Sequence, residues 1–201
     1  LLRWFDYVPL GDVIPGTRFI CCKVSLTKVF PKPLRSFRPE DLASAVAEKG
    51  YQLGLVIDLT YTDRYYSGKE FTDRSIEYVK IFIPHYKYFR QFCDVVEDFH
   101  RRAPQNALIA VHCTHGINRT GYFVCRYLVE QLRWTASQAI EGMYFPFLYQ
   151  TAGHMSLGFF NEEFPKGDHE SGQLSSNNQV NFHSVQVSNR DISKVSFPSH
   201  S

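Results

Sequence analysis

Short apolar runs alternate with longer amphipathic segments along most of the chain. Nearly continuous apolar runs occur at 19–24, 54–60, 78–83 and 107–112. Runs of this length that are rich in Val, Ile, Leu and Phe are typical of strands buried inside a sheet. We therefore predict four strands at these positions.

Between the strands, apolar residues recur with helical spacing. The segment after the strand at 78–83 is the clearest case, because Phe92, Val96 and Phe99 fall on one helical face. Helices are predicted over 39–50, 87–102, 120–132 and 135–143. Strands that alternate with helices favour an α/β fold with a largely parallel sheet.

The two ends of the chain lack this periodicity. Residues 1–18 mix aromatic side chains with proline and glycine, which predicts an irregular entry segment. From residue 161 onward Ser, Asn, Gln and His dominate, and we interpret 161–201 as a flexible tail. The expected organisation is a catalytic domain at 1–160, with an atypical C-terminal part, followed by this tail.

Composition narrows the function only slightly. The formal net charge of +2 does not indicate a nucleic-acid binder by bulk charge, although it leaves room for a local basic pocket. The five cysteines match neither a zinc pattern nor a disulfide framework, and reduced thiols indicate an intracellular compartment. No apolar run approaches the ~20 residues of a membrane span, so we expect no membrane association.

The motif that carries chemistry lies between the strand at 107–112 and the next helix. It reads His-Cys-Thr-His-Gly-Ile-Asn-Arg-Thr from His112 to Thr120. In an open parallel sheet, ligands bind beyond the carboxyl ends of the strands. A loop at that position points N–H groups inward, and the following helix adds its positive N-terminus. The pattern predicts a cradle for phosphate.

The residue types in the loop suit nucleophilic attack on phosphorus. A positive cradle favours the thiolate of Cys113, the reactive form of the side chain. The planar guanidinium of Arg119 can hold two phosphoryl oxygens and follow them into the transition state. Gly116 allows close approach of the backbone, and Asn118 tolerates a left-handed conformation. The residues expected to bind the phosphate are Thr114, His115, Gly116, Ile117, Asn118 and Arg119.

Two flanking residues are expected to support the loop. His112 should hydrogen-bond it from below rather than act as a base, and Thr120 should offer its hydroxyl to the Cys113 thiolate. Ordinary interpretations exist, because a Cys after a strand usually packs in the core and Asn118-Arg119-Thr120 also matches a glycosylation acceptor. The full combination in its strand–loop–helix context outweighs them.

This loop is the signature of cysteine-dependent protein phosphatases, and the string from His112 to Gly121 resembles the RNA triphosphatase branch of that superfamily. Stretches at 4–9, 14–20, 53–62 and 64–66 are also similar to that branch. The resemblance implies a protein tyrosine phosphatase-like fold of three layers, with a central, mostly parallel sheet flanked by helices. It implies removal of the γ- and then the β-phosphate from RNA through a phosphocysteine on Cys113, without metal or other cofactor.

The resemblance also implies partners and a location. The substrates would be RNA 5′ ends that carry a tri- or diphosphate, and ribonucleoprotein or splicing factors are further candidate partners. The protein would act in the nucleus as a monomer.

The chain departs from the family in the loop after the strand at 78–83, which is shorter and holds no Asp, and again from Gly142 onward. Protein phosphatases use a loop Asp to protonate a poor leaving group, whereas a diphosphate leaves with less help. The loss therefore weakens phosphotyrosine hydrolysis more than phosphoanhydride hydrolysis. Two alternatives stay open: a dual-specificity protein phosphatase, and a catalytically impaired isoform that still binds RNA or ribonucleoprotein.

Residues outside the loop are weaker candidates. Arg64, Lys80 and Arg126 are candidates to hold the remaining phosphates or the RNA backbone, although a solvated surface charge is the more ordinary interpretation. Tyr65 and Tyr66 are candidates to stack on a base, with packing as the more ordinary interpretation.

Overall fold

The computed structural model describes residues 4, 7–29, 37–83 and 88–143. All of them belong to the compact unit Leu1–His154. The predicted boundary between residues 160 and 161 and the predicted tail lie outside the described residues.

A five-stranded sheet forms the centre of this unit, and four of its strands run parallel. The order across the sheet is β1-β2-β5-β3-β4, with β1 antiparallel to β2 at one edge. The strands are β1 (Leu10–Val13), β2 (Phe19–Cys22), β3 (Gln52–Asp58), β4 (Glu77–Lys80) and β5 (Ala107–His112). The α/β prediction is confirmed, and β5 is buried along its whole length, as expected for a central strand.

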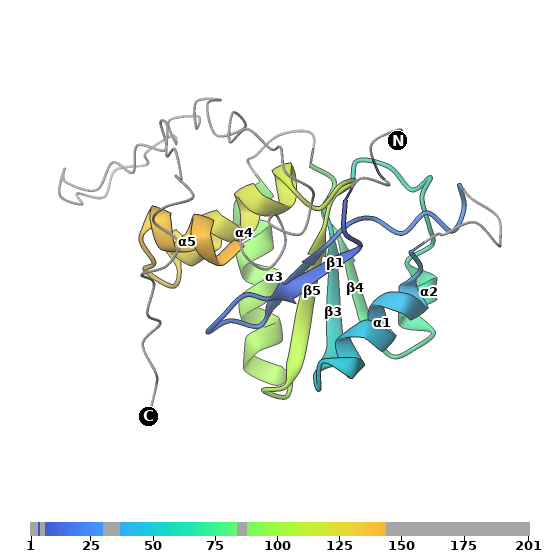
Figure 1. Cartoon of the computed structure of the whole chain (residues 1–201), viewed down its shortest axis with the longest axis horizontal. Helices are drawn as coiled ribbons and strands as arrows, with labels where there is room; N and C mark the ends of the chain where they lie inside the picture. The colour runs from blue at the N-terminus through green and yellow to red at the C-terminus, as the bar shows by residue number, and fades with distance from the viewer. Residues whose placement is uncertain (1–3, 5–6, 30–36, 84–87, 144–201) are drawn as a thin grey trace. The chain divides into compact units, whose positions relative to one another are not determined.

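Helices cover both faces of the sheet, as the ribbon in Figure 1 shows. Leu42, Val46 and Phe71 pack with one face in a single apolar cluster. On the other face, Phe92 packs against Phe19 of β2 with ring centroids 6.2 Å apart. The helices are α1 (Pro39–Glu48), α2 (Lys69–Thr72), α3 (Phe89–Arg102), α4 (Asn118–Glu130) and α5 (Ala136–Met143). In the described ranges, none of these helices is long and apolar enough to cross a bilayer.

Strand β1 was not expected, because residues 1–18 had been interpreted as irregular. Its sequence, Leu-Gly-Asp-Val, carries no alternation strong enough to predict a strand. It forms because the turn at Gly16, which has a φ of 72°, returns the chain to pair with β2. The short helix α2 was also missed, and only Phe71 anchors it in the core.

The parallel strands bring polar residues into one row at their carboxyl ends. In register across the sheet, Cys22 of β2 pairs with His112 of β5, His112 with Asp58 of β3, and Asp58 with Lys80 of β4. Residues in register on parallel strands point to the same face of the sheet. The phosphate loop begins directly after this row.

Candidate active site

The loop from Cys113 to Ile117 connects β5 to α4, as the motif predicted. Gly116 has a φ of 78°, in the left-handed region that favours glycine. Asn118 was expected to take such a conformation, but it is the first residue of α4 instead. Left-handed geometry at Gly116 turns the chain into the helix and leaves Asn118 in its first turn.

The loop has the groups that an anion requires. Within the described part of the chain, no acceptor engages the N–H groups of Gly116, Ile117 and Asn118. These three groups lie at the N-terminus of a helix of 13 residues, where N–H donors and the helix dipole favour negative charge. Cys113 is 4% exposed at the base of the loop.

Arg119 stands in the first turn of α4 and is anchored at one end. Its Nη1 donates to the carbonyl oxygen of Leu59 at 2.8 Å, and Leu59 donates its own N–H to the His112 carbonyl at 2.8 Å. No carboxylate among the described residues pairs with Arg119. One edge of the guanidinium is therefore fixed, and the other donors are available to phosphoryl oxygens.

His112 supports the loop from below, which confirms the predicted contact. Its Nδ1 lies 3.2 Å from the Cys113 carbonyl oxygen, and its Nε2 lies 2.7 Å from the Tyr66 hydroxyl. Burial lowers the pKa of His112, and the neighbouring Asp58 only partly offsets this. A neutral ring has one hydrogen, and a carbonyl can only accept, so we place that hydrogen on Nδ1. Nε2 then faces the Tyr66 hydroxyl, which has a single hydrogen for two acceptors, Nε2 at 2.7 Å and the Asp58 carboxylate at 3.1 Å. This contact fixes the ring and the first residue of the loop.

Asp58 is the centre of the polar row, and it was not predicted as a functional residue. Its side chain accepts from the Thr60 N–H at 2.7 Å, the Tyr66 and Tyr78 hydroxyls at 3.1 and 2.8 Å, and Lys80 Nζ at 2.9 Å. Burial alone would raise the pKa of Asp58, but the charge of His112 and the hydrogen bonds from Lys80 and Thr60 lower it to about 2. At neutral pH the lasting counter-charge of Asp58 is Lys80.

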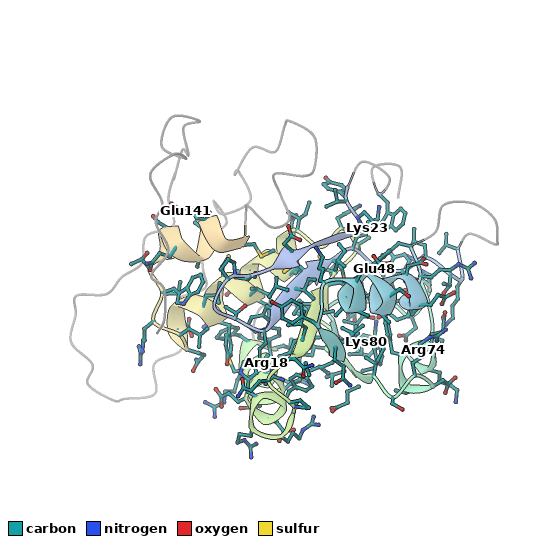
Figure 2. All side chains as sticks on the ribbon, turned by 60° about the horizontal axis from the view of Figure 1, so that its bottom comes forward. Arg18, Lys23, Glu48, Arg74, Lys80 and Glu141 are labelled. Carbon is teal, nitrogen blue, oxygen red and sulfur yellow. The ribbon has the colours of Figure 1, made fainter. Side chains whose placement is uncertain are left out.

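The weaker cation candidates are occupied by protein groups. Lys80 donates to Asp58, to the Thr60 hydroxyl and to the Thr62 carbonyl, each at 2.9 Å, and it is labelled in Figure 2. Arg126 binds Glu130 at 2.6 Å and lies over the Phe89 ring. These two side chains are tied into the fold and are not open phosphate ligands.

Arg64 and Tyr66 also differ from the candidate roles. Arg64 is exposed and donates to the Thr62 hydroxyl at 3.2 Å. Tyr66 is 5% exposed and belongs to the polar row, so it cannot stack on a base. Tyr65 is partly buried against the apolar core.

Thr120 does not make its expected contact with Cys113, and His115 contacts a residue outside the loop. Thr120 is fully buried, and among the described residues its hydroxyl has no hydrogen-bond partner, so the bond to Cys113 is not formed here. His115 contacts Tyr7, with ring centroids 5.2 Å apart. The N-terminal segment therefore reaches the loop and packs against one of its side chains.

Lys23 is a further buried cation near the loop. It follows β2, next to Val24, whose N–H donates to the Thr114 carbonyl at 3.3 Å. Its Nζ donates to the carbonyls of Trp4 and Tyr7 at 3.1 and 2.7 Å. Burial lowers the pKa of Lys23 to about 8. Sequence reasoning missed this residue, because no local pattern marks a lysine at a strand end as buried.

Comparison with known proteins decides the family. The model of the dual specificity phosphatase catalytic domain matches residues 39–160. The chain belongs to this family. All five cysteines are free and buried, and Cys113, at the base of the loop, is the only one in the signature motif.

Individual relatives agree with this assignment. The RNA/RNP complex-1-interacting phosphatase of Mus musculus is 45% identical over 148 residues, which cover 69% of this chain and 46% of that protein. The tyrosine-protein phosphatase of Autographa californica nuclear polyhedrosis virus is 36% identical over 144 residues, which cover 69% of this chain and 85% of the viral protein. The chain thus spans about half the length of the mouse relative.

A solved structure supports the fold alone. Human DUSP28 superposes with a TM-score of 0.50 at 11% identity, over 76% of this chain and 88% of that chain. The family match over residues 39–160 is what assigns the catalytic domain of a phosphatase to this chain. In the described residues no group of three or more His, Cys, Asp or Glu could hold a metal ion, and metal-free chemistry stays a prediction.

Proposed function

We propose that this phosphatase removes the γ- and β-phosphates from RNA 5′ ends through a phosphocysteine on Cys113. The thiolate attacks the terminal phosphorus in line, the P–O bond to the leaving diphosphate breaks, and Arg119 and the loop N–H groups hold the phosphoryl oxygens. Water then attacks the phosphocysteine, which releases phosphate and restores the thiolate.

The observation that carries the proposal is the loop after β4. Residues 81–88 read Ile-Phe-Ile-Pro-His-Tyr-Lys-Tyr and contain no acid. Asp63 pairs with Lys80 at 3.5 Å, and Asp94 pairs with Arg90 on α3. A leaving diphosphate needs little protonation, whereas a phenoxide or alkoxide needs a general acid. The name of the mouse relative, which refers to RNA/RNP complexes, points to the same substrate class.

The proposal keeps the partners and location that the sequence implied. RNA 5′ ends with tri- or diphosphates are the substrates, ribonucleoprotein or splicing factors are candidate partners, and the nucleus is the site of action. No cofactor is needed, since every bond change above uses only protein groups and water.

The test is phosphate release from RNA labelled at the γ or β position, beside p-nitrophenyl phosphate, with and without EDTA. We expect release from RNA that is insensitive to EDTA, and Cys113→Ser should abolish it while keeping binding of inorganic phosphate. Unchanged turnover in Cys113→Ser would exclude the nucleophile. Turnover of p-nitrophenyl phosphate alone would favour the dual-specificity protein phosphatase, and no turnover by a folded chain would favour an RNA-binding isoform.

A further inference from the structure

Two exposed aromatic rings contact each other at the edge of the sheet that holds the phosphate loop. Tyr61 is 63% exposed and Phe82 is 46% exposed. Their ring centroids lie 6.3 Å apart with an interplanar angle of 87°. Large aromatic side chains left in water are a cost to the free protein, so a mutually packed exposed pair indicates a binding surface.

The backbone places this pair beside the active site. Tyr61 lies two residues after Leu59, whose carbonyl accepts from Arg119 at 2.8 Å. Phe82 follows Ile81, whose N–H donates to the Asp58 carbonyl at 2.9 Å. Two residues of chain span at most about 7 Å, so the backbone of Tyr61 lies within that distance of the residue that anchors Arg119.

The charges around the rings select a neutral ligand group. Lys80 Nζ lies 5.0 Å from the Phe82 ring centroid, but it is already bound to Asp58 at 2.9 Å and to Asp63 at 3.5 Å. The Asp63 carboxylate is 70% exposed on the same loop as Tyr61 and repels phosphate. The phosphate loop is the place for anionic groups, and the aromatic pair is a place for a flat, uncharged one.

We propose that Tyr61 and Phe82 form a stacking platform for the first base of a 5′-triphosphate RNA whose terminal phosphate lies in the loop at Cys113. This inference rests on the proposed function and specifies how the substrate is held. Aromatic side chains beside a cationic groove bind unpaired bases by stacking, with little preference for sequence. The platform replaces Tyr65 and Tyr66, which are packed into the fold.

The kinetic test compares a substrate that has a base with one that does not. For Tyr61→Ala and Phe82→Ala, the ratio of kcat/KM for triphosphate RNA to kcat/KM for inorganic triphosphate should fall roughly 5- to 150-fold, since stacking contributes about 1–3 kcal/mol per base. Tyr61→Phe keeps the ring and should restore the ratio. Tyr51→Ala is the matched control, because Tyr51 is 39% exposed just before the opposite end of β3. Equal ratios in Tyr61→Ala and Tyr51→Ala would overturn the platform.

A binding measurement separates this inference from the proposed activity. Cys113→Ser should quench the fluorescence of a short triphosphate RNA with 2-aminopurine at its first position, and adding Tyr61→Ala should remove most of the quenching. If the quenching depends on Tyr61 but the protein with Cys113 intact shows no triphosphatase turnover, the platform is supported and the proposed activity is refuted. Turnover of RNA with no such quenching would support the activity and refute the platform.

Discussion

Removing the charge of Asp58 tests whether the polar row holds the phosphate loop in place. Asp58→Asn keeps the shape of the side chain but leaves Lys80, whose side chain is 10% exposed, without its buried counter-charge. The amide also replaces one acceptor oxygen with a donor, so Tyr66, Tyr78 and Lys80 can no longer all donate to it. The variant should therefore be less stable and should position His112 less firmly.

Two independent estimates bracket the loss of stability. The pKa of Asp58 falls from its ordinary 3.8 to about 2 in the fold, and at 1.36 kcal/mol per pKa unit this corresponds to about 2 kcal/mol. Removing one partner of a buried ion pair costs about 3–5 kcal/mol. We expect a loss of about 2–5 kcal/mol, a large share of the roughly 5–15 kcal/mol that stabilises a domain.

Urea unfolding at pH 7 measures this loss directly. The midpoint should fall by about 1–2.5 M for a typical slope of about 2 kcal/mol per molar urea. Asp63→Asn is the matched control, because Asp63 pairs with the same lysine but is 70% exposed, and an exposed pair contributes about 0–1 kcal/mol. A loss for Asp58→Asn no larger than for Asp63→Asn would refute the role of the polar row.

The pH dependence of the stability gives a second check, because the pKa shift of Asp58 fixes the direction of the change. The pKa of Asp58 is lower in the folded chain, so its contribution is present above about pH 4 and is lost as the pH falls toward 2. The difference in stability between the wild type and Asp58→Asn should be constant above pH 5 and shrink by about 2 kcal/mol between pH 4 and 2. A difference that does not change with pH would mean that the charge of Asp58 is not what stabilises the fold.

Two further variants test the loop and the buried lysine. Gly116→Ala should cost about 1–2 kcal/mol of stability and lower kcat, because φ is 78° there and a side chain disfavours that conformation. Gly121→Ala is the control, since its added Cβ would meet only Met143 Cε at 3.7 Å. Equal effects of the two substitutions would contradict the argument. The pKa of Lys23 is lowered to about 8 by burial, so the unfolded chain binds more protons above pH 8 and stability should rise with pH up to about 10.5. Lys23→Met should remove up to about 3 kcal/mol of that rise in urea titrations, and a rise that persists would assign it to another group.

Much of the fold follows from local patterns, and the active-site loop follows from its motif. Each of the four predicted strands is present, although β4 covers only Glu77–Lys80 instead of 78–83 and is half-buried. Strands β2 and β5 are buried along their whole length, and there a continuous apolar run leaves no polar position to disturb the pattern. Strand β1 could not be predicted in the same way, since its pairing with Phe19–Cys22 forms only once the turn at Gly16 brings the two together. The pairing of an edge strand depends on tertiary contacts, and a sequence of four residues does not predict it.

The residues around the loop show a different limit. Asp58 binds Tyr66, Tyr78 and Lys80, which are 8, 20 and 22 positions away in the sequence. Asp58, Lys80 and His112 each close a strand of the structure, where the carboxyl ends of parallel strands meet at one edge. The strands predicted from the sequence ended at residues 60, 83 and 112, so only His112 stood at a predicted strand end. Packing, the more ordinary interpretation of Tyr66, is what the structure shows, whereas the exposure of Tyr61 was not predicted, because burial in a loop depends on the path of the backbone and not on any period.

Under the proposed activity, the pairing of charges at this edge favours the removal of one phosphate at a time. Lys80 is neutralised by Asp58, and Lys23 is held by two carbonyls. Arg119 pairs with no carboxylate among the described residues and donates through Nη1 to the Leu59 carbonyl, so its other donors stay available at the loop. A cradle with one free arginine stabilises one transferring phosphoryl group at a time. Under the proposed activity, the γ- and then the β-phosphate must each enter the same loop, and a sequence-tolerant stacking platform at Tyr61 allows the RNA to move inward by one phosphate between the two steps.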